Sequence, residues 1–272
     1  MNLPDTENQA DKTGEICGKI AKDFTDGCRK IFGANLRGVY LHGSAAMGCF
    51  NPRKSDLDFL AVVENPLTDN ERLDFLAMVL ALDSSADAPA KGLELSVVLR
   101  SVCENFRYPT PFEFHFSRAH KKWAEDAPLD FIEKMRGTDK DLAAHFVIIK
   151  NRGKCLFGEP VTIFGQVPQS AFFDSILCDC LDGADEITEN PVYYALNMAR
   201  ALAFKNDGLV LSKKEGAHWA MQNLPKEHAL VAENALADYE SGEKTEQNPD
   251  ALKKYAAYMI ARIQGAAQAG AE

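Results

Sequence analysis

Residues 39–63 read VYLHGSAAMGCFNPRKSDLDFLAVV. The apolar residues at both ends predict two strands, joined by a Gly43-Ser44 turn, one helical turn and a loop. Side chains alternate along a strand, so Asp56 and Asp58 at the start of the second strand point the same way. Two neighbouring carboxylates repel each other unless a positive charge lies between them. A hard divalent cation with oxygen ligands is the usual solution.

The Gly43-Ser44 turn predicts a second ligand beside that cation. Backbone amides that open a helical turn bind phosphate groups. Metal, phosphate and a strand-end pair of aspartates together indicate nucleotidyl transfer. The alternative, in which Asp56 and Asp58 form only a polar entry to a strand, explains the pattern Gly-Ser-x(11)-Asp-x-Asp less well.

Glu94 is the third acid of interest. It interrupts the apolar segment Leu93–Leu99, which predicts a strand, at the same end as Asp56 in its own strand. A carboxylate in a sheet is costly unless it is paired or used. Glu94 could share two cations with the aspartates, or it could take the proton of an acceptor hydroxyl as a general base. A solvent-facing or cross-strand-paired acid is the non-functional alternative.

The first part of the chain mixes helices and strands. We expect a loose polar arm over 1–13, an amphipathic helix over 15–32 and a strand over 36–42. A capping box, Thr68 to Glu71, predicts a helix to about Leu82. The alternation over 112–116 predicts a further strand, and a helix is expected over 138–152.

The second part contains only helix signals. A Gly/Pro-punctuated crossing at 158–168 favours a domain boundary, so we predict domains 1–164 and 165–272. A capping box starts at Ser212, and Asn248-Pro249 begins the last helix. Helices are expected at 170–182, 190–206, 213–223, 226–240 and 249–267. The fold class is α+β: a mixed sheet with flanking helices, followed by an all-α bundle.

Composition restricts the partners. The 272 residues carry a net charge of −10, which argues against a nucleic-acid binder that uses a broad basic surface. The N-terminus has no signal-peptide pattern, and no apolar run approaches a membrane span. The seven scattered cysteines include no C-x-x-C pair and indicate reduced thiols. We expect a cytoplasmic monomer that binds neither nucleic acid nor membrane.

Two short motifs carry a resemblance to a known family. Leu41–Ser44 with Ser55–Asp58 is similar to the signature of the DNA polymerase β-like nucleotidyltransferases. Leu93–Val98 resembles the strand with the catalytic Glu in the aminoglycoside (3'')(9) adenylyltransferases. The second half of the chain resembles the helical domain of these enzymes. The matching residues fall in the same order and spacing as in the family: Asn197–Arg200, Lys213, Trp219–Pro225 and Ala237–Tyr239. The resemblance covers about residues 35–265.

This resemblance implies roles residue by residue. Asp56, Asp58 and Glu94 would hold two Mg²⁺ ions, with Glu94 also the general base. The phosphate and ATP contacts would come from both domains: Gly43, Ser44 and Ser55 from the first, and Arg200, Lys213 and Tyr239 from the second. Two cations on the second domain would complete the phosphate site when the domains face each other.

Departures from the family pattern bear on the acceptor. Ala119 stands where the family has a Trp that packs on streptomycin, and Trp123 is out of register. The acids that bind the aminocyclitol have Glu186 and Asn190 as counterparts, with Glu189 beside them. The acidic segment 182–186 still attracts a cationic amino sugar. The resemblance therefore implies transfer of AMP from ATP to a hydroxyl of an aminoglycoside or aminocyclitol, with spectinomycin favoured over streptomycin.

Two alternatives remain open at this point. One is a nucleotidyltransferase acting on a different small molecule or a protein hydroxyl. The other is a non-catalytic nucleotide-binding module, which has no need of a base on the sheet.

Overall fold

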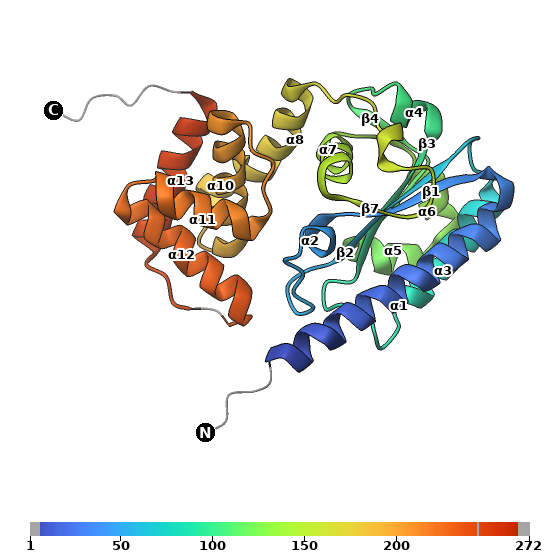
Figure 1. Cartoon of the computed structure of the whole chain (residues 1–272), viewed down its shortest axis with the longest axis horizontal. Coiled ribbons are helices and arrows are strands. Elements are labelled where there is room, and N and C mark those ends of the chain that lie inside the picture. Colours follow the sequence, from blue (N-terminus) through green and yellow to red (C-terminus); the bar gives the residue numbers. More distant parts are fainter. Residues whose placement is uncertain (1–5, 244, 266–272) are drawn as a thin grey trace. The chain divides into compact units, whose positions relative to one another are not determined.

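The computed structural model describes residues 6–243 and 245–265 (Figure 1). The chain divides into two compact units, Met1–Gln166 and Val167–Glu272. From the sequence, the boundary is expected between residues 164 and 165.

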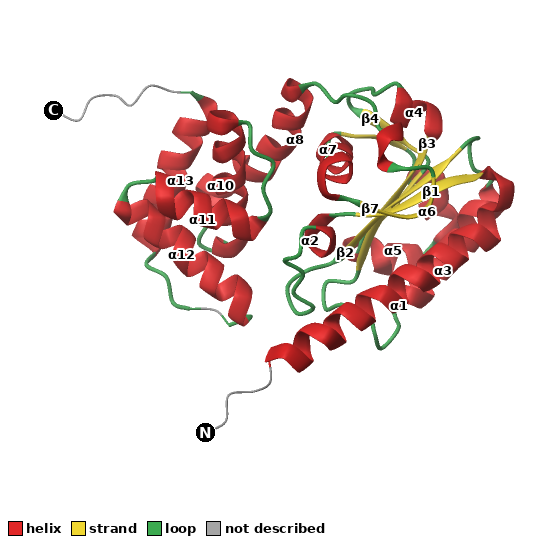
Figure 2. Cartoon of the chain, viewed as in Figure 1, coloured by secondary structure: helices red, strands yellow, loops and turns green. Residues whose placement is uncertain are grey.

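The first unit is built on a five-stranded mixed sheet (Figure 2). The strand order is β5-β3-β2-β1-β7, in which β2 and β3 run parallel and the other neighbours run antiparallel. The strands are β1 (Leu36–Leu41), β2 (Leu57–Val63), β3 (Leu93–Leu99), β5 (Phe114–Phe116) and β7 (Lys154–Gly158). The mixed sheet with flanking helices and the helical second half confirm the predicted fold class.

One face of this sheet packs against α1 (Thr6–Phe32), α3 (Asp69–Asp83) and α6 (Pro128–Lys134). Alternate residues of the central strands enter this core, for example Phe59 and Leu95. The apolar residues of α1 recur at helical spacing, and Phe24 stacks on Phe59 with ring centroids 4.4 Å apart. The predicted amphipathic helix on a sheet is confirmed.

The other face of the sheet lies toward α2 (Gly43–Ala46) and α7 (Leu142–Arg152). Tyr40 projects here and meets Phe164, which in turn meets Phe146 of α7, with centroids about 5 Å apart. By alternation, Asp58 and Glu94 project from this same face, opposite α1. The first unit is completed by α4 (Arg100–Glu104), α5 (Lys121–Asp126) and the small sheet of β4 (Thr110–Phe112) and β6 (Gly137–Asp139).

Several predicted boundaries were wrong. Residues 6–13 are helical, so the predicted loose arm is wrong there, and residues 1–5 lie outside the described residues. The strand predicted over 112–116 is two strands in two sheets. Glu113 separates them because buried Arg72 binds both its carbonyl and its carboxylate, at 2.7 and 2.6 Å. Tertiary pairing thus overrides the local alternation.

The predicted crossing at 158–168 begins inside the sheet. Gly158 ends β7 and pairs with Gly38 of β1, at a φ of +84°. A Cβ at this position would collide with the carbonyl of Arg37. Gly158 is therefore required for strand pairing and does not mark a linker.

The second unit contains helices only among its described residues. They are α8 (Gln169–Leu181), α9 (Gly183–Glu186), α10 (Pro191–Asp207), α11 (Lys213–Asn223), α12 (Lys226–Ser241) and α13 (Pro249–Gln264). Helix α10 is central and packs against α8, α11, α12 and α13. The capping box at Ser212 and the Asn248 N-cap are both formed, which confirms these two predicted starts. The short helix α9 was not predicted.

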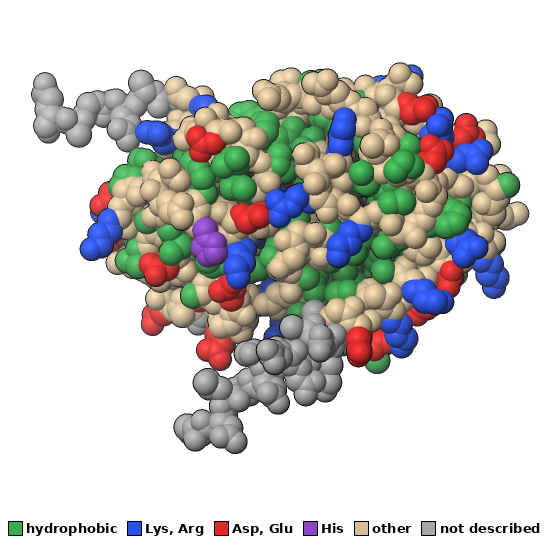
Figure 3. Space-filling model, in the orientation of Figure 1, with side chains coloured by type: hydrophobic (Ala, Val, Ile, Leu, Met, Phe, Trp, Pro, Cys, Tyr) green, Lys and Arg blue, Asp and Glu red, His purple; other side chains and the backbone are tan. Residues whose placement is uncertain are grey.

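Three further features of the described residues concern charge, hydrophobicity and cysteine chemistry. On the face shown in Figure 3, basic and acidic side chains are interspersed. No helix of the described residues is long and apolar enough to span a bilayer. All seven cysteines are free thiols.

Candidate active site

Three carboxylates meet at one end of the parallel strand pair. Asp58 and Glu94 are register partners on β2 and β3, and Asp56 lies two residues before Asp58. One oxygen from each of Asp56, Asp58 and Glu94 lies within 4.8 Å of the others. This set of hard oxygen donors fits a divalent cation such as Mg²⁺. The parallel register explains the meeting, because equivalent ends of β2 and β3 lie side by side.

The Gly43-Ser44 turn lies directly against Asp58. The amide of His42 donates to the carbonyl of Asp58 at 3.0 Å, which fixes the turn on β2. Gly43 has a φ of +58°, and a Cβ on it would collide with the Asp58 carboxylate. Both the left-handed backbone and the lack of space require glycine here. The predicted phosphate turn and the carboxylates thus occupy one place.

The two serines differ in their surroundings. Ser44 Oγ is buried and has no hydrogen-bond partner among the described residues. A buried hydroxyl without a partner is costly, so this position suits a ligand oxygen. Ser55 is buried, and its Oγ accepts from the amide of Asn51 at 3.1 Å. Ser55 therefore also shapes the loop that delivers Asp56.

Burial raises the pKa of Glu94 to about 7. His145 acts in the opposite direction, and the carboxylates of Asp56, Asp141 and Asp139 raise the pKa further. A pKa close to the working pH is the condition under which a general base is most effective.

Sequence reasoning missed two of the acids around Glu94. Asp139 ends β6, and its carboxylate accepts from the amide of Asp141 at 2.9 Å. Their sequence predicts only the start of a helix. The available signal was a pair of aspartates two positions apart, as in Asp56-x-Asp58, but without a strand before it.

The histidines near the site are packed together. His42 is buried, and its ring lies 4.7 Å from that of His145 on α7. Burial, together with His145, lowers the pKa of His42 well below its usual range. His42 is therefore a neutral structural histidine beside the phosphate turn.

The candidate ATP residues of the second unit lie on its helices. Arg200 on α10 donates from Nε to the carbonyl of Leu211 at 2.8 Å and from Nη1 to Asn197 Oδ1 at 3.1 Å. Lys213, at the start of α11, holds its Nζ 5.3 Å from the centre of the Tyr193 ring. Tyr239 is buried on α12.

The candidate acceptor residues surround the start of α10. Glu186, on α9, accepts from the Tyr194 hydroxyl at 2.6 Å. Glu189 and Asn190 are exposed, and Asn190 is the residue before the first turn of α10. In the first unit, Ala119 is exposed, whereas Trp123 packs on Phe131 with ring centroids 5.0 Å apart. Trp123 is partly buried and packs against the core of the first unit.

Comparison with solved structures identifies the class of fold. The chain matches the crystal structure of spectinomycin adenyltransferase AAD(9) from Enterococcus faecialis with ATP and spectinomycin. The TM-score is 0.76 at 20% identity, and the match covers 90% of this chain and 98% of the other. The fold is that of the nucleotidyltransferases, as predicted.

Comparison of sequences finds similarity to adenylyltransferases over both halves of the chain. Residues 162–262 match the model of the aminoglycoside adenylyltransferase C-terminal domain. The chain is 28% identical over 250 residues to spectinomycin 9-adenylyltransferase from Staphylococcus aureus, covering 89% of this chain and 90% of the relative. It is 24% identical over 240 residues to aminoglycoside (3'')(9) adenylyltransferase from Escherichia coli, covering 84% and 88%. Residues 162–262 are thus similar to the C-terminal domain of these enzymes, and the resemblance predicted from the sequence is confirmed.

Proposed function

We propose that this protein transfers AMP from ATP to a hydroxyl of spectinomycin or a related cationic aminocyclitol, releasing pyrophosphate. The main support is the proximity of the carboxylates of Asp56, Asp58 and Glu94 to one another, beside the Gly43-Ser44 turn. The similarity extends over both units, including relatives named as spectinomycin 9-adenylyltransferases. A metal-compatible acid cluster at a phosphate turn matches the requirements of nucleotidyl transfer.

The carboxylates of Asp56, Asp58 and Glu94 would hold Mg²⁺, with two ions expected. Bound there, Mg²⁺ neutralises phosphate charge and polarises the phosphoryl oxygens. Ser44, with its buried hydroxyl, and the amides of the Gly43-Ser44 turn would orient the triphosphate. The second unit would contribute Arg200, Lys213 and Tyr239 to ATP. Positioning and charge neutralisation supply most of the catalysis in phosphoryl transfer.

Glu94 would act as the general base. Its carboxylate takes the proton of the acceptor hydroxyl while that oxygen attacks the α-phosphorus, and pyrophosphate leaves with the electron pair of the broken P–O bond. Glu186, Glu189 and Asn190 would bind the amino groups of the acceptor.

An acceptor panel tests the proposal. The full-length protein is incubated with ATP, Mg²⁺ and single antibiotics, and pyrophosphate release is followed. We expect release with spectinomycin and little with streptomycin, because Ala119 offers no aromatic surface. Omission of the acceptor or addition of a chelator provides the background rate. Release with no aminoglycoside or aminocyclitol of the panel would contradict the acceptor class.

A further inference from the structure

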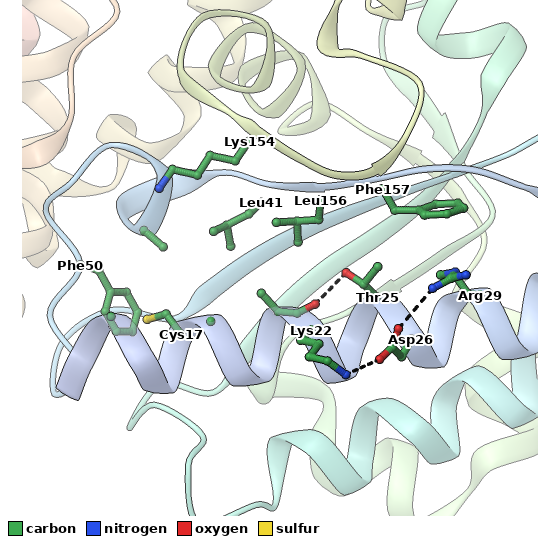
Figure 4. Close-up of a pocket in the computed structure, with 14 residues that line it drawn as sticks. Cys17, Lys22, Thr25, Asp26, Arg29, Leu41, Phe50, Lys154, Leu156 and Phe157 are labelled. Carbon is green, nitrogen blue, oxygen red and sulfur yellow. Dashed lines mark hydrogen bonds and ion pairs between the residues drawn. The ribbon is translucent and has the colours of Figure 1, made fainter. Parts of the chain in front are cut away.

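A cavity of about 600 Å³ lies between α1 and strands β1 and β7 (Figure 4). Its walls are largely apolar and include Ala21, Leu41, Phe50, Leu156 and Phe157. This volume is within the range of small-molecule sites. The cavity is on the α1 side of the sheet, whereas Asp58 and Glu94 project from the other face.

Glycine on α1 makes room for this cavity. Gly14 and Gly18 lie one helical turn apart and both line it. A Cβ added to either would meet no described atom within 4 Å. The helix therefore presents backbone where larger side chains would fill the space.

The edge of the cavity carries positive charge. Asp26 pairs with Lys22 at 2.7 Å and with Arg29 at 3.6 Å, and both cations come from α1. Arg29 also lies 5.1 Å from the centre of the Phe157 ring, which closes one end of the space. Figure 4 shows these three residues along the helix. The cavity lining thus includes three cations, Lys22, Arg29 and Lys154, and one carboxylate, Asp26.

Lys154 is the cation of the cavity lining that could pair with a bound anion, since Lys22 and Arg29 already pair with Asp26. It opens β7 on the wall opposite α1 (Figure 4). Its ammonium group makes no salt bridge with any residue between Gly14 and Gly265 that the structure describes. Burial raises the pKa of the Cys17 thiol overall, and the positive charge of Lys154 acts in the opposite direction.

We propose that this cavity binds a small organic anion with an apolar tail, of the alkyl carboxylate class. The tail would lie along the apolar walls between Gly18 and Leu156, and the carboxylate would pair with Lys154. The positive charge at the edge of the cavity favours an anionic group, and the apolar walls favour a hydrocarbon tail. This proposal does not rest on the proposed transferase activity, because it uses none of the same residues.

Isothermal titration of the full-length protein with decanoate tests the proposal. Decyltrimethylammonium has the same tail with the opposite charge, and acetate has the charge without the tail. We expect saturable binding of decanoate alone. Binding of the ammonium compound as tightly as decanoate, or no saturable heat with decanoate, would overturn the proposal.

Three variants locate the ligand. Lys154→Gln should weaken decanoate binding about tenfold through loss of a charge-assisted hydrogen bond. Lys30→Gln is the matched control, because Lys30 is an exposed lysine of α1 outside the cavity. Gly18→Leu should fill the cavity and abolish binding while the melting temperature holds or rises, because leucine favours helix over glycine. Unchanged affinity in both Lys154→Gln and Gly18→Leu would place the ligand elsewhere and refute the site.

Discussion

Asp58 and Gly43 lie so close that only a hydrogen fits between the glycine backbone and the carboxylate. The sequence predicted that both residues belong to one site, from their spacing between two apolar strands. The contact itself could not be predicted from the sequence. It depends on the path of the loop between the two residues, which is folded by hydrogen bonds between Asn51 and Ser55. The effect of Asp139 and Asp141 on the pKa of Glu94 could not be predicted for a similar reason. Both residues come from a segment whose sequence shows no strand pattern.

Replacement of Gly43 tests this contact. Gly43→Ala should reduce turnover on the order of a hundredfold, because the methyl group displaces the Asp58 carboxylate. Gly48→Ala is a matched control: Gly48 also has a positive φ, +73°, but its Cβ would meet nothing within 4 Å. Both variants should lose about 1–2 kcal/mol of stability in urea unfolding. Equal turnover in the two variants would show that the contact is unimportant.

Glu94→Gln tests the base. The amide cannot accept the proton of the acceptor hydroxyl, so turnover should fall by roughly a hundredfold or more. Nucleotide binding, measured by equilibrium titration with Mg²⁺ and ATP, should change much less if Asp56 and Asp58 carry the metal. Turnover that survives the substitution would assign the base to another group.

At the scale of elements, the long strands and the capped helices were predictable from the sequence, and the short strands were not. The strands 57–63 and 93–99 and both capping boxes follow from local sequence. In contrast, β7 is five residues of mixed character, and β4 and β6 are three residues each, so that their pairing depends on the rest of the fold. Glu113 illustrates the cause, because buried Arg72 determines where one strand ends and the next begins.

Asp83 joins three elements and supports a prediction about acid stability. It ends α3, has a fully buried side chain, and accepts from the Leu93 amide, Lys121 and Arg118. Burial alone raises its pKa, but these hydrogen bonds outweigh burial and the pKa is lowered overall. The carboxylate therefore stabilises the fold above its unfolded pKa of about 3.9, and this stabilisation is lost as pH falls through the lower folded value.

Asp83→Asn should lower the free energy of unfolding by about 3 kcal/mol at pH 7. The difference from the unmodified protein should shrink as pH falls below about 4, because protonation removes the same charge. Urea unfolding between pH 3 and 7 measures both effects. Asp126→Asn is the control, because its one ion pair with a described residue is the exposed pair with Lys122. A constant difference over the whole interval would contradict this role of Asp83.

At the scale of the whole molecule, the composition change along the chain reflects two separate cores. The loss of strand signals after residue 165 predicted a helical second half, and described residues of Val167–Glu272 form only helices. The core of this unit is formed within it, for example where Tyr255 donates to the carbonyl of Ala195 at 2.9 Å. No pattern in the sequence predicted which helix is central. Helix α10 is the central helix, and its buried residues accordingly lie around most of its circumference.

Residues 167–272 should therefore fold when expressed alone. We expect a helical circular dichroism spectrum and a single cooperative thermal transition. Within this fragment, Leu196→Ala should cost about 2–5 kcal/mol, because Leu196 is fully buried. Leu230→Ala should cost much less, since Leu230 is 54% exposed. A fragment without a cooperative transition would show that its core needs the first unit.

The parallel pairing of β2 with β3 also affects the order of events during folding. Strands β1 and β2 can pair as soon as the loop between Leu41 and Leu57 closes. Asp58 and Glu94 are 36 positions apart (94 − 58), and they meet only after the chain has passed through α3 and returned. Contacts between distant positions form slowly, because a long loop must close first. During synthesis on the ribosome, the β1–β2 pair can therefore exist before the carboxylate cluster does.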